Sequence, residues 1–232
     1  MNLALIAITD EGVQIAERIK AKLCNEVTLF LPQKIKKTGL DVTYFSKNLG
    51  DQVGEIFTDY EGFIFIMASG IVVRIIAPHI KNKHTDPAIV VVDDVGRSVI
   101  SLVSGHEGGA NKLAHMVANI LSTDAIITTG TEAKKNIIIG IGCKRGVASK
   151  DVKDAINKAI KVVNIPIAQV RLAGTVDLKA NEQGLLSALE ELNIPLRVVS
   201  RQEIDACAKF YTKSDFVEKK IGVGGVCEPA AL

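Results

Sequence analysis

The chain has 232 residues, of which 47% are hydrophobic and only 4% aromatic, so its core must be aliphatic, as in proteins with buried strands. The charges of its 28 basic and 26 acidic residues nearly cancel. The chain therefore has no strong net positive charge that would indicate a nucleic-acid partner. No apolar run approaches the roughly 20 residues of a membrane span, and the apolar start without a basic leader predicts a buried strand, not a signal peptide.

The cysteine pattern indicates a reducing compartment. The four cysteines are Cys24, Cys143, Cys207 and Cys227, and they form no CxxC pair. Neither a zinc site nor a disulfide framework is indicated. Because reduced thiols fit a cytoplasmic protein, we expect a cytoplasmic location.

The first part of the chain predicts alternating strands and helices. Strands are expected at 3–8, 26–31 and 62–68, and the last is apolar on both faces and should be central. A helix capped by Thr9 or Asp10 follows the first strand, and a helix capped by Ser46 precedes the third. Residues 33–39 should form a loop. Ser69 and Gly70 open a short helix that stops near Pro78.

A hairpin and a second α/β region are expected next. The strands 88–92 and 98–103 flank a short polar connection with a glycine, which indicates an antiparallel hairpin. A helix at 110–121 and a strand at 125–128 follow. Beyond them, strands are expected at 137–142, 169–172 and 196–199. One helix should bury Val152, Ile156, Ala159 and Val163, another Leu185, Leu186, Leu189 and Leu192, and Ser200 with Glu203 has capping-box spacing.

These elements predict the α/β class, with two α/β domains that each contain a mostly parallel or mixed sheet flanked by helices. The polar segment 132–136 is the best candidate boundary. We therefore expect an N-terminal domain at 1–131, a short linker at 132–136 and a C-terminal domain at 137–232.

The strongest candidate for a functional site is a glycine-rich segment that also carries an imidazole, a carboxylate and a carboxamide. It lies between a predicted strand and a predicted helix and reads Ser104-Gly105-His106-Glu107-Gly108-Gly109-Ala110-Asn111. Glycines and small residues there allow a sharp turn with bare backbone N–H groups, and the helix adds unpaired N–H groups of its own. This order of elements predicts an anion site.

Each polar residue of this loop has two interpretations. His106 is a general base or acid, or it only shapes the loop by hydrogen bonding. Glu107 orients His106 or activates water, or it simply favours the positive end of the helix. Asn111 binds a substrate carbonyl or supports the turn.

Small-residue turns follow several predicted strands, at 69–70, 104–109, 128–131 and 140–146. Since ligands of open α/β sheets bind outside the carboxyl ends of strands, we expect these turns to gather at one edge around a multiply anionic ligand. Arg74 interrupts an apolar run and should be half-buried, with Asp86 or a ligand carboxylate as its partner. His79 and His84 flank Lys81 and Lys83, and they either help to hold an acidic ligand or lie in a solvated loop.

A dinucleotide site is only weakly indicated. The glycines Gly140, Gly142 and Gly146 have GxGxxxG spacing instead of GxGxxG, and no acidic residue follows at the expected distance. Cys143 lies at this turn, where a helix N-terminus would lower its pKa, but a small structural residue is the commoner explanation.

The runs ASGIVVRIIAP, KHTDPAIVVVDDVGRSVISLVSGHEGGANKLA and ITTGT, between Ala68 and Thr131, resemble the amino-terminal region of the cobalamin-biosynthesis protein G (CbiG) family, the cobalt-precorrin 5A hydrolases. GIGCKRG, DLKANEQGLL and the closing GVGGVCEPAAL resemble the carboxyl-terminal domain of that family. The family usually has a middle segment where only 132–136 stand here. Its last domain continues past the EPAAL helix, so we expect either a shortened form or a partner that covers a sheet edge.

The resemblance implies a reaction on the oxygen-independent route to cobalamin. A δ-lactone on a cobalt-containing tetrapyrrole is opened, acetaldehyde is released and cobalt-precorrin 5B is formed. The cobalt comes with the substrate, so no cofactor or metal ligands of the protein's own are expected. For this reaction we expect His106 and Glu107 to be catalytic, with the N–H groups of Gly108 and Gly109 as oxyanion donors. Substrate-binding residues are expected at Ser69, Gly70, Arg74, Ser104, Gly105, Gly108, Gly109, Asn111, Thr129, Lys144, Arg145 and Lys179.

Two other functions stay open at this point. The first alternative is a non-catalytic protein that binds or carries a corrinoid intermediate. The second, which has weaker support, is a nucleotide-binding α/β protein. The expected partner is the cobalt tetrapyrrole, with no nucleic acid and no membrane. A second copy of the chain or other enzymes of the pathway are the protein partners that the sequence leaves open.

Overall fold

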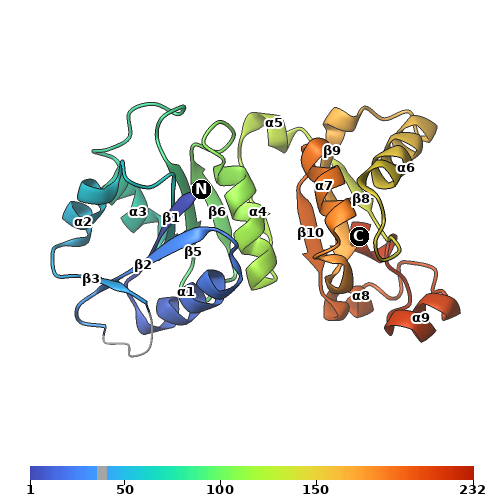
Figure 1. Ribbon diagram of the computed structural model, residues 1–232, viewed down its shortest axis with the longest axis horizontal. Coiled ribbons are helices and arrows are strands. Elements are labelled where there is room, and N and C mark those ends of the chain that lie inside the picture. The colour runs from blue at the N-terminus through green and yellow to red at the C-terminus, as the bar shows by residue number, and fades with distance from the viewer. Residues whose placement is uncertain (36–40) are drawn as a thin grey trace. The chain divides into compact units, whose positions relative to one another are not determined.

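The computed structural model describes residues 1–35 and 41–232, which divide into two compact units, Met1–Thr129 and Gly130–Leu232. Both units combine a β-sheet with helices, so the predicted α/β class is confirmed (Figure 1). Residues 36–39 of the predicted loop at 33–39 lie outside the described residues. None of the described helices has the length and apolar character needed to cross a membrane.

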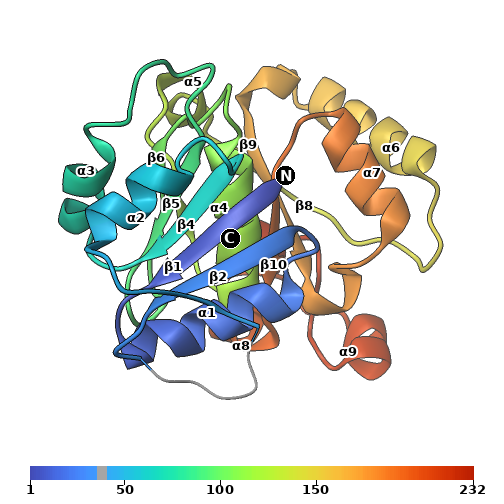
Figure 2. The ribbon, with the colours of Figure 1, turned by 60° about the vertical axis from the view of Figure 1, so that its left-hand side comes forward.

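The first unit is built on one sheet, in which seven strands of the described residues take part. They are β1 (Asn2–Ala7), β2 (Glu26–Pro32), β3 (Thr43–Phe45), β4 (Gly62–Ile66), β5 (Ala88–Val92), β6 (Val99–Val103) and β7 (Ala125–Ile126). Their order is β3-β2-β1-β4-β5-β6-β7, and Figure 2 shows β2, β1 and β4 side by side. The strands from β3 to β5 are parallel, whereas β6 is antiparallel to β5 and β7 is parallel to β6.

Helices cover both faces of this sheet. α1 (Asp10–Lys22) and α4 (Ala110–Leu121) pack on one face, and α2 (Leu49–Ile56) and α3 (Ser69–Ile76) pack on the other. β4 is buried along its whole length and lies in the middle of the sheet, as its apolar sequence predicts. The result is a three-layer α/β/α unit.

Side-chain caps mark the starts of α1 and α2. The Thr9 hydroxyl accepts a hydrogen bond from the Gly12 N–H at 3.0 Å, which confirms the predicted cap of α1. The predicted Ser46 cap is wrong, because α2 begins three residues later and Asn48 accepts from the Asp51 N–H at 2.9 Å. β3 was not predicted, since a three-residue strand has too few side chains to show a period.

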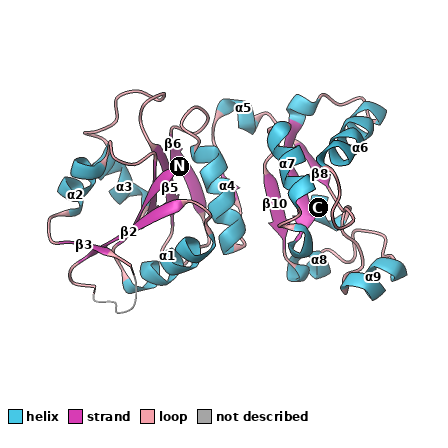
Figure 3. Cartoon of the chain, viewed as in Figure 1, coloured by secondary structure: helices cyan, strands magenta, loops and turns pink. Residues whose placement is uncertain are grey.

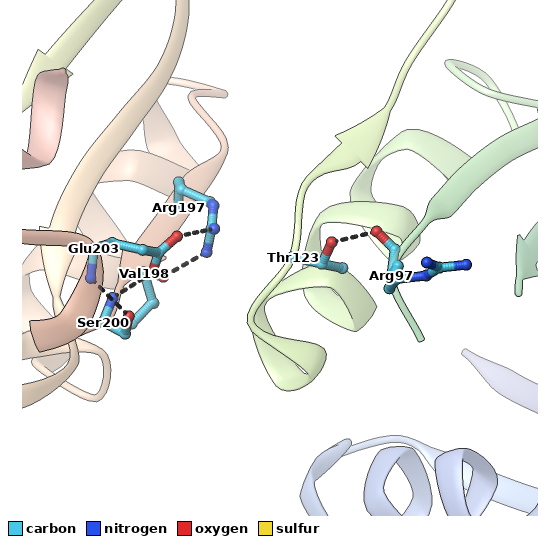
Figure 4. Close-up of polar contacts among 6 residues, drawn as sticks. All are labelled: Arg97, Thr123, Arg197, Val198, Ser200 and Glu203. Carbon is cyan, nitrogen blue, oxygen red and sulfur yellow. Dashed lines mark hydrogen bonds and ion pairs between the residues drawn. The ribbon is translucent and has the colours of Figure 1, made fainter. Parts of the chain in front are cut away.

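The predicted hairpin of β5 and β6 is confirmed. Asp93 accepts hydrogen bonds from the Arg97 and Ser98 N–H groups, at 2.6 and 3.0 Å, and these close the turn. The Thr123 hydroxyl then donates to the Arg97 carbonyl at 2.6 Å (Figure 4). This contact ties the hairpin to the segment that follows α4.

In the second unit, three strands of the described residues form a parallel sheet in the order β10-β9-β8. Figure 3 draws the strands in magenta. Its elements are α5 (Gly130–Ala133), β8 (Ile137–Gly140), α6 (Ser149–Val162), β9 (Val170–Val176), α7 (Gln183–Glu191), β10 (Leu196–Val199), α8 (Arg201–Ala206) and α9 (Asp215–Ile221), with short 3-10 turns η1 (Ile167–Gln169), η2 (Asp177–Lys179) and η3 (Pro229–Ala231). α6 and α7 pack on one face of the sheet, against Val170 and Ala173 of β9.

Two sequence predictions in this unit have clear outcomes. The Ser200–Glu203 capping box at the start of α8 is confirmed, and Glu203 also holds Arg197 at 2.8 Å (Figure 4). The predicted buried stripe of α6 is only partly right, because Ala159 is exposed and Val163 lies beyond the helix with 59% of its surface exposed. Of the four predicted residues, α6 buries only Val152 and Ile156.

Candidate functional site

The predicted turns of the first unit lie at two opposite edges of its sheet. β6 runs against β5, so the end of β6 meets the edge where β1, β4 and β5 begin, which we call the amino edge. The loop 104–109, here the glycine loop, is therefore at the amino edge, whereas Ser69 and Gly70 follow β4 at the opposite, carboxyl edge. The expectation of a single gathering edge is wrong for these two groups, and the antiparallel hairpin is the physical reason.

The glycine loop closes tightly on itself. Ser104 adopts a left-handed backbone with φ of 58°, and its carbonyl accepts from the Ala110 N–H at 3.2 Å. The Gly105 carbonyl accepts from the Asn111 N–H at 2.9 Å. These bonds use the first N–H groups of α4, so the prediction that the helix N-terminus is free to hold an anion is wrong for these two donors.

Glycine is required at position 108. A Cβ there would lie 2.4 Å from the Ser104 Cβ and 3.3 Å from the Asp86 carbonyl oxygen. Asp86 precedes β5, so the glycine loop packs directly against the loop 81–86. The two loops together form the amino-edge site.

Asn111 and Thr129 hold the base of the glycine loop. The Ser101 hydroxyl donates to the Asn111 side-chain oxygen at 2.7 Å, and the Asn111 amide donates to the Thr129 hydroxyl at 3.1 Å. Gly105 packs on both of them, since a Cβ at this position would lie 2.8 Å from each. Of the two roles expected for Asn111, support of the turn is the one that the structure shows.

His106 and Glu107 are exposed at the tip of the glycine loop. Glu107 forms an ion pair with Lys83 at 2.8 Å, in place of the expected contact with His106. The Lys83 hydrogen bond, followed by the backbone N–H of Glu107 itself, lowers the pKa of the Glu107 carboxyl. The alternative prediction places Glu107 in the first turn of a helix, where its carboxylate would interact with the helix dipole. This prediction is wrong, because α4 begins at Ala110 and Glu107 precedes it.

The loop 81–86 has a buried anchor. The Asp86 carboxylate accepts from the Lys81 and Asn82 N–H groups at 2.9 Å, so it is already satisfied by backbone. Asp86 is therefore not the partner of Arg74, and the prediction of a half-buried Arg74 is wrong: its side chain is exposed and has no ion pair within the described residues. α3 is covered on one side only, and Arg74 lies on its open side.

The histidines before β5 differ in role. His79 packs on Phe57, with ring centroids 5.4 Å apart, and against Gly54 of α2, so it is a structural residue. His84 is exposed and lies near enough to Glu107 to help lower its pKa. The sequence signal for Lys83 and His84 as site residues was the hairpin itself, because an antiparallel β6 brings the loop after β6 beside the loop before β5.

The amino-edge site offers a base and hydrogen-bond donors. Within the part of the chain that the structure describes, the backbone N–H groups of Gly108 and Gly109 make no hydrogen bond. The Ser104 hydroxyl is buried and has no partner there either. An exposed imidazole can activate water, and free backbone N–H groups can stabilise an oxyanion.

The second unit places its predicted residues at the carboxyl ends of β8 and β9. Lys144 and Arg145 are exposed in the loop after β8. Lys179 pairs with Glu182 at 3.8 Å, and Glu182 accepts from the Gly146 N–H at 2.7 Å, which joins the two strand ends. Burial raises the pKa of the Cys143 thiol, which favours the structural interpretation of this cysteine.

The glycines of the second unit make room for its own backbone. A Cβ at Gly140 would lie 1.5 Å from the Cys227 carbonyl oxygen, and one at Gly174 would lie 1.8 Å from the Ala230 carbonyl oxygen. The segment around η3 thus packs flat on the ends of β8 and β9. This contact explains Gly140 without a dinucleotide. Among the described residues, no group of three or more His, Cys, Asp or Glu side chains is arranged to hold a metal ion.

The fold and these loops define an α/β protein of two units whose strand ends carry exposed polar and charged side chains, as ligand-binding α/β proteins do. The chain belongs to the CbiG family. The family model described as "Cobalamin synthesis G N-terminal" matches residues 51–132, and the model "Cobalamin synthesis G C-terminus" matches residues 137–232.

Named relatives align over the whole chain. The cobalt-precorrin-5A hydrolase of Salmonella typhimurium is 24% identical over 322 positions, which cover 99% of this chain and 91% of the relative. That of Priestia megaterium is 26% identical over 332 positions, covering 100% and 88%. A cobalamin biosynthesis protein G homolog from Sulfolobus solfataricus, known as a crystal structure, is 20% identical with a TM-score of 0.42, covering 100% and 88%. Since this chain has 232 residues, at least 90 of the 322 positions aligned with the Salmonella protein have no counterpart here.

Proposed function

We propose that this protein is a cobalt-precorrin-5A hydrolase of cobalamin biosynthesis. The observation that carries the proposal is the match of both halves of the CbiG family, together with hydrolases of that name that align over 99% and 100% of the chain. A cytoplasmic location stays a prediction that rests on the cysteine pattern.

The proposed reaction opens the δ-lactone of the cobalt tetrapyrrole. Water attacks the lactone carbonyl and the lactone C–O bond breaks, which leaves a carboxylate and a two-carbon alcohol that is still attached to the macrocycle. The hydroxyl of this alcohol then loses its proton, the C–C bond to the macrocycle breaks and the fragment leaves as acetaldehyde. The macrocycle carbon takes up a proton, which gives cobalt-precorrin 5B. This chemistry belongs to the oxygen-independent route to cobalamin. The cobalt is part of the substrate, so the proposed role of the protein is to bind the ring, activate water and stabilise the oxyanion.

We assign the base to His106 and the oxyanion donors to Gly108 and Gly109. Exposure of the imidazole and the two unused N–H groups support this assignment. Glu107 is a positioning residue in this scheme, since its ion pair with Lys83 fixes the glycine loop on the loop 81–86. Among the other expected residues, Lys144 and Arg145 are exposed cations suited to substrate carboxylates.

The test is acetaldehyde release from cobalt-precorrin 5A, followed with a coupled NADH-dependent alcohol dehydrogenase. Loss of a general base lowers turnover by roughly a hundredfold or more, and we expect this for His106→Ala, with tetrapyrrole binding largely retained. His84→Ala is the informative comparison, because His84 is the other exposed histidine at this edge. Undiminished turnover in His106→Ala would dismiss His106, and a collapse in His84→Ala alone would move the base to His84.

A non-catalytic corrinoid carrier is the second candidate. The observation that favours it is the absence here of at least 90 positions present in the alignment with the Salmonella hydrolase. A carrier would bind cobalt-precorrin 5A with saturable affinity and release no acetaldehyde. The same assay therefore separates the two functions.

A further inference from the structure

A cavity of about 420 Å³ opens at the carboxyl edge of the first unit, away from the glycine loop. It lies where β1, β2 and β3 end: Ile8 follows β1, Pro32 ends β2 and Phe45 ends β3. Leu49, the first residue of α2, completes the apolar part of its lining. We call it the β1–β3 cavity. Its volume falls within the range of small-molecule sites, roughly 300–1,000 Å³.

The lining combines an apolar floor with cationic side chains. Phe45 belongs to the buried core between the sheet and α2, and Ile8 and Leu49 pack against that core. Lys34 and Lys47 also line the cavity. Lys47 pairs with Glu55 of α2, whereas Lys34 is exposed and makes no ion pair within the described residues. A lysine ammonium without an ion-pair partner, next to apolar side chains, is suited to bind a ligand that has a carboxylate on an apolar framework.

The topology of the sheet makes this edge the natural one for a ligand. From β1 the chain builds outward to β2 and β3, then returns to the other side of β1 for β4 and β5. In open α/β sheets, ligands bind outside the carboxyl ends of the strands. The reversal lies between β1 and β4, and the β1–β3 cavity lies at the same edge, beside it, over the ends of β1, β2 and β3. The glycine loop is at the opposite edge, and five-residue strands such as β4 separate the two edges by roughly 16 Å.

We infer that the β1–β3 cavity is a second ligand site of the first unit, which binds a corrinoid ring through its carboxylate side chains. The choice of a corrinoid among apolar carboxylates rests on the proposed function. In this site, Ile8, Phe45 and Leu49 cover apolar parts of the ligand while Lys34 and Lys47 hold carboxylates. The site is separate from the amino-edge site in position and in residues.

The absence of tryptophan from the sequence allows a direct test with one reporter at each edge. Gln33→Trp places a single fluorophore on the lining of the cavity, and Thr85→Trp places one at the amino edge. Both positions are exposed, so neither change disturbs the core. The probe is a cobalt corrinoid with free carboxylate side chains, titrated at low salt into the 232-residue chain.

We expect saturable quenching of Gln33→Trp by this probe. The same ring with its side chains as amides should bind several-fold more weakly, because the lysines lose their charged partners. In the Gln33→Trp background, Lys34→Gln should weaken binding of the carboxylate form roughly two- to fivefold and leave the amide form unchanged. Lys158→Gln, an exposed lysine of α6, is the matched charge control and should have no effect.

Several results would overturn the inference. They are quenching of Thr85→Trp alone, undiminished binding of the carboxylate form in Lys34→Gln, equal binding of carboxylate and amide rings, or displacement of the probe by propionate alone at equal concentration. Acetaldehyde release by the unaltered chain is measured separately. Hydrolysis without binding at the cavity therefore refutes this inference only, and binding at the cavity without hydrolysis refutes the proposed function only.

Discussion

Ser104 combines two unfavourable features in one residue. Its backbone is left-handed, with φ of 58°, and its hydroxyl is buried without a partner among the described residues. An unsatisfied buried hydroxyl costs about 1–3 kcal/mol. Ser104→Ala removes the hydroxyl and keeps the Cβ, so we expect it to stabilise the first unit by about 1 kcal/mol, measured by urea unfolding. A clear loss of stability would show that the hydroxyl is satisfied in solution.

Glu107 and Lys83 predict a pH effect at the same site. The folded-state pKa of Glu107 is lowered, so the ion pair contributes stability that is present above the ordinary carboxyl pKa and lost as pH falls through the lowered value. We expect an NMR titration of the Glu107 carboxyl to have its midpoint below that of an unperturbed glutamate. In Lys83→Gln the midpoint should rise toward the ordinary value, and an unchanged midpoint would contradict the assigned cause.

At the scale of elements, the glycine loop tolerates no extra carbon where it folds back. Gly108→Ala would force a Cβ into contact with Ser104, and such overpacking typically costs 1–3 kcal/mol. Gly70 in α3 is the matched control, because a Cβ there meets nothing within 4 Å. Gly70→Ala should leave stability unchanged or raise it by up to about 1 kcal/mol. Equal thermal unfolding of the two variants would contradict this description of the loop.

The elements also show what a sequence can and cannot reveal. β4 and β5 were predictable because every residue is apolar and buried, and α1 because Thr9 caps it. β3 is too short to have a pattern, and the α2 cap lies two residues beyond the nearest serine. The residues of the glycine loop were identifiable from their types. Their position was not, because the edge at which they lie depends on strand direction in the assembled sheet.

For the molecule as a whole, each unit has hydrophobic clusters of its own. We therefore expect calorimetry to resolve two unfolding transitions. Ile64→Ala, in the first unit, and Leu185→Ala, in the second, each remove a fully buried side chain, which typically costs 2–5 kcal/mol. Each variant should lower only the transition of its own unit. A single transition lowered by both variants would show that the units unfold together.

Whole-molecule properties set the limit of the sequence prediction. The α/β class followed from alternating apolar runs, and the family from long matching motifs. The partners of Glu107, Arg74 and Asp86 did not, because each pairing depends on which loops the tertiary fold brings together. A side chain that has a backbone partner in the fold can look unpaired in the sequence, as Asp86 does.

The hydrogen bonds that run from Ser101 through Asn111 to Thr129 have a consequence for recognition. They fix the base of the glycine loop before any ligand arrives, so most of the ordering cost of that base is met during folding. Encounter with a ligand then needs to restrict little more than the two exposed side chains at the tip. A pre-organised loop of this kind favours rapid, lock-and-key capture over slow structural adjustment.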